Sequence, residues 1–250
     1  MVNIILSGCN GRMGQVVTRI VKERDDCCVA AGIDIKDDVQ NDYPVFKKLS
    51  DFEGCADVLI DFSHPSQLSS VLEYCRRKNI PAVICTTGLT DEQKNELTAA
   101  AESTGIFFSA NMSIGINLIT ELAKTAASVL SGFDIEIVEK HHNQKIDAPS
   151  GTALSIADAI SEVRTQPTEY VYDRHSVRRK RKESEIGIHA VRGGTIVGEH
   201  TVIFAGADEV IEIKHSAASR EVFATGAVRA AIYMKDKKKG MYNMSDLING

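Results

Sequence analysis

The chain has 250 residues, 43% of them hydrophobic and 25% charged, an ordinary composition for a globular protein with one large or two modest domains. Its formal net charge of −5 argues against a nucleic acid or an anionic membrane as a partner. No apolar run approaches the ~20 residues that cross a bilayer, and the N-terminal residues lack the features of a signal peptide, so we expect a cytoplasmic protein.

Short apolar runs alternate with amphipathic stretches through the first 112 residues. The stretches have helical spacing, and Thr90 and Gln93 form a capping box for one of the helices. Strands that are apolar almost throughout and alternate with helices predict a parallel sheet covered on both faces, which is an α/β fold of the Rossmann type. The strands are expected at 2–8, 27–34, 56–63, 81–88 and 106–111.

The pattern changes after Asn111. A long helix near 114–130 is followed by a strand at 133–142 and by a helix that opens at Ser150. Three further runs are separated by glycine-rich turns and predict an antiparallel meander, at 185–194, 195–206 and 208–217.

These patterns predict two domains. An α+β domain of residues 113–219 is inserted into a dinucleotide-binding domain. The latter comprises residues 1–112 and 220–250, and its last part begins with a helix.

A glycine-rich loop, "GCNGRMG", lies between the first strand and the first helix. Its glycines, Gly8, Gly11 and Gly14, let the chain turn tightly and bring backbone amides and the helix dipole close to a pyrophosphate. Arg12 adds a positive charge there. The spacing is GxxGxxG rather than GxGxxG, so the motif is a weaker signal than the usual fingerprint.

The acidic residue expected about twenty positions further on is Asp34, where a carboxylate can accept hydrogen bonds from ribose hydroxyls. Asp34 favours NADH because a carboxylate repels a 2′-phosphate. Lys36 could offset that repulsion, so NADPH stays open as an alternative.

The segment "EKHHNQKIDAPSGTAL", Glu139 to Leu154, concentrates positive charge in an acidic protein. A metal site is not expected, because adjacent histidines on a strand point to opposite faces and the six cysteines have no paired CxxC spacing. A solvated strand end is one interpretation. The alternative is an anion site, since Ser150, Gly151 and Thr152 supply small residues and backbone amides at the start of a helix, beside Lys145 and His142.

Six segments together resemble the 4-hydroxy-tetrahydrodipicolinate reductase (dihydrodipicolinate reductase) family of diaminopimelate and lysine biosynthesis. They are "GCNGRMG", "DFS" at 61–63, "CTTG" at 85–88, "SANMSIGIN" at 109–117, "EKHHNQKIDAPSGTAL" at 139–154 and "IHAVRGGTIVGEHTV" at 188–202. The resemblance implies NAD(P)H-dependent reduction of a cyclic dicarboxylate, 4-hydroxy-tetrahydrodipicolinate, to tetrahydrodipicolinate. It also implies a homotetramer in which the inserted domain binds substrate and forms the subunit contacts.

The resemblance further implies the roles of individual residues. His141 is a proton donor or acceptor and Lys145 a proton donor, with the choice between them open. Substrate-binding positions are His142, Gly151 and Thr152, to which our own argument adds Lys145 and Ser150. Cofactor-binding positions, to which our own argument adds Lys36, are Gly8, Cys9, Asn10, Gly11, Arg12, Met13, Asp34, Cys85, Thr86, Thr87, Ala110, Asn111, Met112 and Ser113.

Two positions depart from the family pattern. Ile35 stands where many relatives have an arginine that can meet a 2′-phosphate, and we therefore expect NADH to serve at least as well as NADPH. Cys85 stands where relatives commonly have glycine, so any role there is expected to use the backbone.

The motifs are also compatible with two alternative functions. A dehydrogenase for another small dicarboxylate is a second hypothesis, and a redox-sensing regulator without catalysis is a third; a regulator would not need His141 and Lys145. The basic run 178–182 is expected to be a solvated loop, and His189 and His200 to be structural, while the direction of Arg192 stays open.

Overall fold

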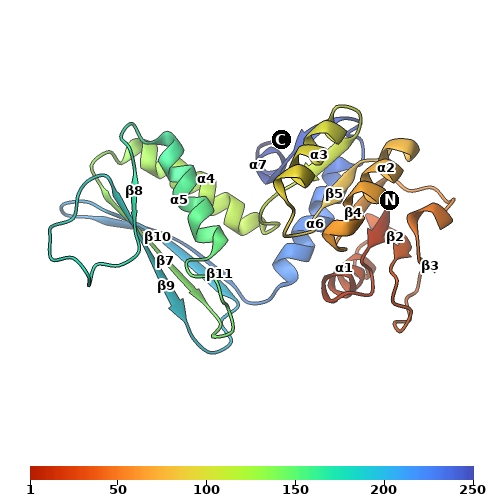
Figure 1. Cartoon of the computed structure of the whole chain (residues 1–250), viewed down its shortest axis with the longest axis horizontal. Helices are drawn as coiled ribbons and strands as arrows, with labels where there is room; N and C mark the ends of the chain where they lie inside the picture. The colour runs from red at the N-terminus through yellow and green to blue at the C-terminus, as the bar shows by residue number, and fades with distance from the viewer. The chain divides into compact units, whose positions relative to one another are not determined.

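The computed structural model describes every residue from Met1 to Gly250 (Figure 1). Contacts within the chain divide it into two compact units. Unit 1 comprises Met1–Ile114 and Glu221–Gly250, and unit 2 comprises Gly115–Arg220. No helix in either unit is both long enough and apolar enough to span a membrane.

Unit 1 is built on a seven-stranded sheet in which every neighbouring pair of strands is parallel. The five expected strands are confirmed, and two short edge strands, β3 and β12, were not expected. The order is β12-β6-β5-β4-β1-β2-β3. The bounds are β1 Val2–Ser7, β2 Cys27–Ile33, β3 Val45–Phe46, β4 Val58–Asp61, β5 Ala82–Ile84, β6 Gly105–Phe108 and β12 Gly240–Tyr242.

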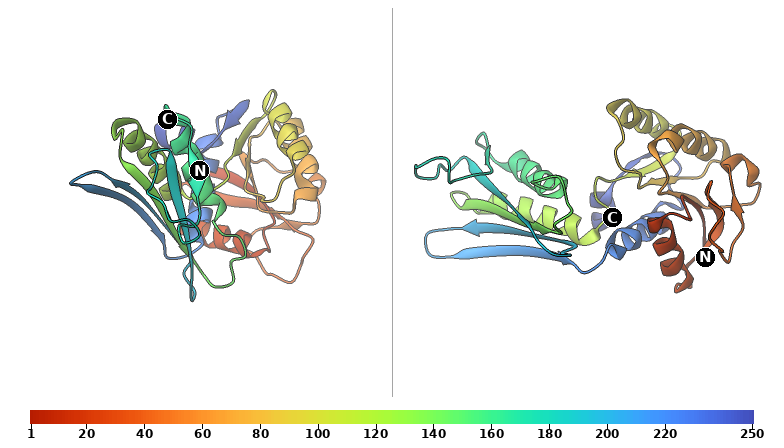
Figure 2. Two further views of the ribbon diagram at one scale, coloured as in Figure 1. Left: turned by 60° about the vertical axis from the view of Figure 1, so that its left-hand side comes forward. Right: turned by 60° about the horizontal axis from the view of Figure 1, so that its bottom comes forward.

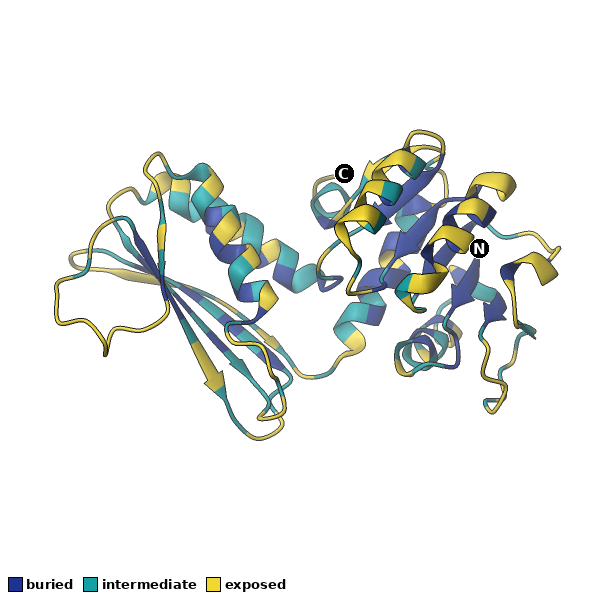
Figure 3. Ribbon diagram, viewed as in Figure 1, coloured by how far each residue is buried: buried dark blue, intermediate teal, exposed yellow.

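Helices cover both faces of this sheet, because successive side chains of a strand point to opposite faces. Ile4 and Leu6 of β1 pack in one core with α1 and α6, and Ile5 packs in a second core with α2 and α3. Figure 3 shows the buried strands between helices whose outer sides are exposed. The helices are α1 Arg12–Lys22, α2 Leu68–Lys78, α3 Asp91–Ala101, α6 Glu221–Met234 and α7 Met244–Asn249, with 3-10 turns at Leu49–Asp51 and Pro65–Gln67.

Unit 2 is a five-stranded mixed sheet with two helices on one face (Figure 2, right). Isoleucines of the central strands pack against Ile116 and Ile119 of one helix and Ile156 and Ile160 of the other. The strand order is β11-β10-β7-β9-β8. The bounds are α4 Ile114–Val129, β7 Asp134–His141, α5 Gly151–Val163, β8 Glu169–Val171, β9 Glu185–Arg192, β10 Gly198–Ala205 and β11 Val210–Ala217.

The predicted antiparallel meander is wrong in one respect. β10 and β11 do form an antiparallel pair, but β9 and β10 do not pair with each other, because β7 lies between them. β9 is parallel to β7, and α5 provides the crossover connection that parallel strands need. The Gly193 amide donates to the His141 carbonyl oxygen (2.9 Å), so the turn after β9 is bound to the end of β7 rather than closing a hairpin.

The basic run 178–182 is a loop between β8 and β9 and is largely exposed, as expected, but two of its arginines pair with acidic residues of the sheet. The Arg181 side chain is only 16% exposed and pairs with Glu136 (3.0 Å) and Asp134 (2.7 Å). Arg179 pairs with Glu185, whose side chain is fully buried, and Arg174 pairs with the same carboxylate at 2.9 Å. The arginines fold back because a buried carboxylate needs a counterion.

The capping box of α3 gives a test of the fold. Thr90 Oγ1 accepts from the Gln93 amide (3.3 Å), and Gln93 Oε1 accepts from the Thr90 amide (3.1 Å). We expect Thr90→Ala to lower the free energy of unfolding by about 1 kcal/mol, as measured by urea denaturation. Thr98→Ala in the exposed middle of the same helix is the matched control, and it should leave stability unchanged or raise it by a few tenths of a kcal/mol. Equal losses in both variants would contradict the capping role.

Candidate active site

The glycine loop joins β1 to α1 in unit 1. Gly8 has φ +77°, and its amide donates to the Ile33 carbonyl oxygen of β2 (2.8 Å). A Cβ at Gly14 would lie 2.2 Å from the Gly8 oxygen, so only glycine allows α1 to start this close to β1. The loop therefore brings the start of α1 to the carboxyl end of β1, where a parallel sheet binds phosphate groups.

Asp34 clamps this loop at the end of β2. Its Oδ2 accepts from the Asn10 amide (2.9 Å), and its Oδ1 accepts from the Lys36 amide (3.0 Å). The Asn10 side chain donates in turn to the Lys36 carbonyl oxygen (2.6 Å). The carboxylate expected to bind a ribose is thus also the residue that holds the loop in place.

A cavity of about 910 Å³ opens beside the loop and Asp34. Its lining includes Gly8, Gly11, Asp34 and Lys36 from the predicted cofactor positions. Four cationic side chains line it, Lys36, Lys47, Lys48 and Arg77, against two acidic ones, Asp34 and Glu73. The cavity is therefore locally cationic in an acidic protein, and it lies at the carboxyl ends of β1, β2 and β4, where dinucleotides bind to sheets of this kind.

The remaining predicted cofactor residues of unit 1 lie outside this lining. Burial raises the pKa of Cys9 to about 11, so its thiol stays protonated. Cys85 and Thr86 follow β5, and the Cys85 amide donates to the Asp61 carbonyl oxygen (2.9 Å). The other positions outside the lining are Asn10, Arg12, Met13, Thr87, Ala110, Asn111, Met112 and Ser113.

Asp61 was not expected from the sequence to be a site residue. It is fully buried at the end of β4 and accepts from Thr86 Oγ1 (2.5 Å) and Ser63 Oγ (2.6 Å). It therefore joins the ends of β4 and β5. Further along, the Ser113 amide donates to Asn111 Oδ1 (2.8 Å), and Met112 packs in the core beneath.

In unit 2, the predicted catalytic residues gather where β7 ends. His141 Nδ1 lies 2.6 Å from Glu139 Oε2, and its ring stands edge-on to the ring of His200 at 5.2 Å. Gly198 of β10 leaves room for this ring, because a Cβ there would lie 3.1 Å from His141 Nε2. No three His, Cys, Asp or Glu side chains come together as a metal site would require.

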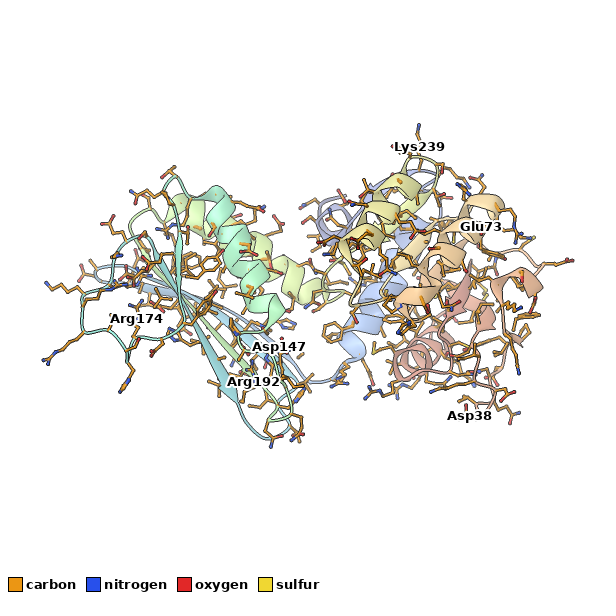
Figure 4. All side chains as sticks on the ribbon, in the orientation of Figure 1. Asp38, Glu73, Asp147, Arg174, Arg192 and Lys239 are labelled. Atoms are coloured by element: carbon orange, nitrogen blue, oxygen red, sulfur yellow. The ribbon has the colours of Figure 1, made fainter.

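Lys145 lies in the loop between β7 and α5. Its amide donates to the His142 carbonyl oxygen (3.2 Å), which turns the chain back. Its ammonium group pairs with Asp147 Oδ1 at 2.8 Å and holds the pKa of Asp147 below its usual range. Arg192 Nη2 donates to the Asp147 carbonyl oxygen (2.6 Å), and Figure 4 shows these two residues close together.

Ser150 begins α5 as its N-cap. Its Oγ accepts from the Ala153 amide (3.2 Å) and lies 3.1 Å from His200 Nε2, while its own amide donates to Glu139 Oε1 (3.0 Å). Both polar groups of Ser150 are thus bound within the chain. Gly151 follows and is exposed, with open space where a Cβ would lie, so a ligand can approach the backbone there.

Glu139 and Arg192 also belong to this site, although no sequence motif indicates a role for Glu139 or the direction of Arg192. Glu139 lies on the same buried face of β7 as Ile135 and Ile137, because alternate residues of a strand share a face. This alternation indicates the burial of Glu139. Arg192 lies opposite His141 in the register of the β7–β9 pair. Both residues therefore lie at the same end of the sheet.

His200 gives a pH-dependent test. Burial, followed by the charge of His141, lowers the pKa of His200 from 6.5 to about 4. Between these values the unfolded chain binds a proton that the folded chain does not, so stability falls as pH falls from 6.5 to 4. The shift corresponds to about 3 kcal/mol.

In the wild type, the free energy of unfolding should fall as pH falls from 6.5 to about 4. In His200→Gln this fall should be smaller by about 3 kcal/mol, as measured by urea denaturation at each pH. His175→Gln, on an exposed loop, should keep the wild-type pH dependence. A His200→Gln variant with the wild-type slope would contradict the neutral, buried state of His200.

Comparison with known proteins gives one family for both units. Residues 2–112 match the family model described as dihydrodipicolinate reductase, N-terminus, and residues 115–248 match dihydrodipicolinate reductase, C-terminus. A curated 4-hydroxy-tetrahydrodipicolinate reductase from Caldanaerobacter subterraneus subsp. tengcongensis is 53% identical over 99% of this chain and 98% of the relative. One from Clostridium tetani is 51% identical over 100% of this chain and 98% of the relative.

Solved structures agree with these matches. A dipicolinate-bound dihydrodipicolinate reductase from Paenisporosarcina sp. TG-14 superposes with a TM-score of 0.83 at 29% identity, over 98% of this chain and 99% of that one. A myo-inositol dehydrogenase from Corynebacterium glutamicum, at 14% identity and a TM-score of 0.63, shares the fold alone. On the matches to both halves and the full-length identities, the chain belongs to the dihydrodipicolinate reductase family.

Proposed function

We propose that this chain catalyses the NAD(P)H-dependent reduction of 4-hydroxy-tetrahydrodipicolinate to tetrahydrodipicolinate in diaminopimelate and lysine biosynthesis. The observation that carries the proposal is the arrangement at the end of β7, where Lys145, His141 and the exposed start of α5 come from one short segment. This arrangement suits a substrate with carboxylates and a ring that must be protonated. Family membership supports the same reaction.

The chemistry divides between the bound groups and the chain's own residues. NAD(P)H, when bound, supplies a hydride. The substrate loses its hydroxyl as water, and the resulting conjugated imine gains one hydride and one proton. Lys145 stabilises the negative charge that develops on the ring and donates the proton, with His141 beside it. His142 and the backbone at Gly151 and Thr152 hold the substrate carboxylates, whereas the Ser150 amide is already bound to Glu139.

A direct assay tests this proposal. Substrate made by condensing pyruvate with aspartate semialdehyde is mixed with the full-length protein and either cofactor, and nicotinamide oxidation is followed by absorbance at the reduced-nicotinamide band. We expect oxidation that depends on the condensed substrate. No oxidation with either cofactor would reject the reductase function.

Lys145→Ala tests the proton donor. We expect kcat to fall by about 10²-fold or more, which is typical of a lost general acid, while the Kd of the cofactor changes little. Lys140→Ala is the matched control, because Lys140 is a nearby lysine on β7 that pairs with Glu199 (3.3 Å) instead. If Lys145→Ala abolishes cofactor binding, or if both variants lose the same activity, Lys145 is misassigned.

We also propose that both cofactors are used, with NADH at least as good as NADPH. The Asp34 carboxylate at the cavity disfavours a 2′-phosphate, and the neighbouring Ile35 is 81% exposed and uncharged. The cations Lys36, Lys47 and Lys48 on the same lining offset part of this repulsion.

The lysines give a test that needs no turnover. Replacing Lys47 and Lys48 together by alanine should raise the Kd of NADPH and of 2′,5′-ADP by about 10-fold, and should change the Kd of NADH and of 5′-AMP much less. Lys94→Ala, which removes an exposed lysine paired with Asp91 on α3, is the control. Calorimetric binding that weakens equally for phosphorylated and unphosphorylated ligands would contradict this role.

A homotetramer is part of the same proposal, with the inserted domain forming the contacts. The face of the unit 2 sheet opposite α4 and α5 carries the exposed Val191 and Val210. Light scattering from the full-length protein would measure the mass directly, and a monomer at micromolar concentration would reject this part.

A further inference from the structure

One buried carboxylate connects the groups at the end of β7. The side chain of Glu139 is fully buried and accepts four hydrogen bonds. Arg192 donates to both oxygens, from Nη1 to Oε2 (2.8 Å) and from Nη2 to Oε1 (2.7 Å). His141 Nδ1 lies 2.6 Å from Oε2, and the Ser150 amide donates to Oε1 (3.0 Å). Asp147 also lies beside Lys145 and the start of α5, but its side chain is 57% exposed, whereas Glu139 is the carboxylate that is buried there.

The burial of the charged Glu139 side chain costs free energy of desolvation. Burying a carboxylate disfavours its charged form and raises its pKa. In Glu139 the hydrogen bonds from Arg192, His141 and Ser150 outweigh burial, and its pKa lies below the usual value. The carboxylate is therefore ionised at neutral pH, at a strand position where Ile135 and Ile137 would predict another apolar residue.

The ionised carboxylate determines which nitrogen of His141 carries hydrogen. A carboxylate can only accept a hydrogen bond, so Nδ1 must be the donor. Neutral His141 then has its lone pair on Nε2, and it can give a proton from Nε2 only after it has first become an imidazolium. This leaves Lys145 as the direct donor to a bound substrate while His141 is neutral.

The same carboxylate fixes the loop and the helix start that flank His141. Its bond from the Ser150 amide holds the first turn of α5 against the end of β7. Arg192, held by Glu139, also donates to the Asp147 carbonyl oxygen (2.6 Å), and Asp147 in turn pairs with the Lys145 ammonium group (2.8 Å). Glu139 thus contacts His141 and the start of α5 directly, and it is linked to Lys145 through Arg192 and Asp147.

We propose that Glu139 is a positioning residue, clamped by Arg192, that sets the Nδ1–H tautomer of His141 and aligns it with the anion-binding start of α5. The inference rests on the proposed function, because the positioned groups are those assigned to proton transfer and carboxylate binding. It adds to that function a requirement for one buried carboxylate, which carries no substrate contact of its own.

Glu139→Gln tests the proposal, because glutamine keeps the size of the side chain but is a weaker acceptor. Glu136→Gln is the matched control. Glu136 lies on the same strand and also pairs with arginines (Arg174 and Arg181) and a histidine (His189 Nε2, 2.8 Å), but on the opposite face of the sheet. If the effect of Glu139→Gln came only from lost stability, Glu136→Gln should show the same effect.

Two measurements on the full-length protein separate positioning from stability. The ¹⁵N spectrum of histidine-labelled protein, assigned with His141→Gln, should show neutral His141 as the Nδ1–H tautomer in the wild type and in Glu136→Gln. In Glu139→Gln the Nε2–H tautomer should increase. In the reductase assay kcat should fall by about 10²-fold in Glu139→Gln and stay near wild type in Glu136→Gln.

Each other outcome overturns the proposal. These are an Nε2–H tautomer in the wild type, a tautomer that changes without a change in kcat, a kcat that falls without a change in tautomer, and equal effects in the two glutamine variants. If Glu139→Gln does not fold, Arg192→Lys is measured instead, because lysine cannot make the bidentate contact with Glu139. This variant must then show a smaller increase in the Nε2–H tautomer of His141 and a smaller fall in kcat.

An inactive wild type would reject the proposed function without deciding the role of Glu139. In that case the tautomer is read together with the Kd for pyridine-2,6-dicarboxylate, measured by calorimetry. This Kd should rise by about 10-fold in Glu139→Gln and stay unchanged in Glu136→Gln. An unchanged Kd in Glu139→Gln would then overturn the positioning role.

Discussion

Two parallel strands in one sheet need a crossover connection, and in both units of this chain a helix provides it. Each helix then begins at the edge where the strands end. In unit 1 this brings the glycine loop, Asp34 and Asp61 together, and in unit 2 it brings His141, Arg192 and the start of α5 together. The chemistry of the family depends on this gathering of side chains and helix amides.

Buried carboxylates hold those edges together. Asp61 and Glu139 are both fully buried at strand ends, and each accepts from partners on neighbouring elements. Breaking the ion pair between Glu139 and Arg192 by removing Arg192 should cost about 3–5 kcal/mol, because a charge is left buried without compensation. A third buried acid, Glu185, pairs with Arg174 and with Arg179 of the basic run in the same way at the other end of unit 2.

Much of unit 1 could be predicted from the sequence, because its strands are continuous apolar runs and its helix starts carry local signals such as Thr90 with Gln93. The edge strands β3, β8 and β12 are only two or three residues long, and so short a run has no periodicity to recognise. The insertion of β7 between β9 and β10 could not be predicted either. Local patterns predict where strands lie but not which strands pair. Here the crossover through α5 makes β9 a parallel neighbour of β7, and β10 pairs with the other edge of β7.

The candidate site was predictable only in part, for a related reason. Glycines, histidines and a helix start are visible in short motifs, whereas Glu139 and Arg192 are far apart in sequence and meet only because β7 and β9 are paired. Ser150 shows the limit most clearly. Its motif predicted substrate contacts, while in the structure its amide and hydroxyl are bound to Glu139, Ala153 and His200.

The start of α1 has a thermodynamic consequence. α3 and α7 each begin with a complete capping box, but α1 begins at Gly11 with no side-chain cap and no acidic residue in its first turn. A glycine N-cap leaves a helix roughly a few tenths of a kcal/mol less stable than a cap by Ser, Thr, Asn or Asp. An anion bound there restores what the sequence omits, and a ligand that binds only the folded chain stabilises it in proportion to the logarithm of its concentration. We therefore expect a pyridine nucleotide that binds at the start of α1 to raise the folded fraction of the chain.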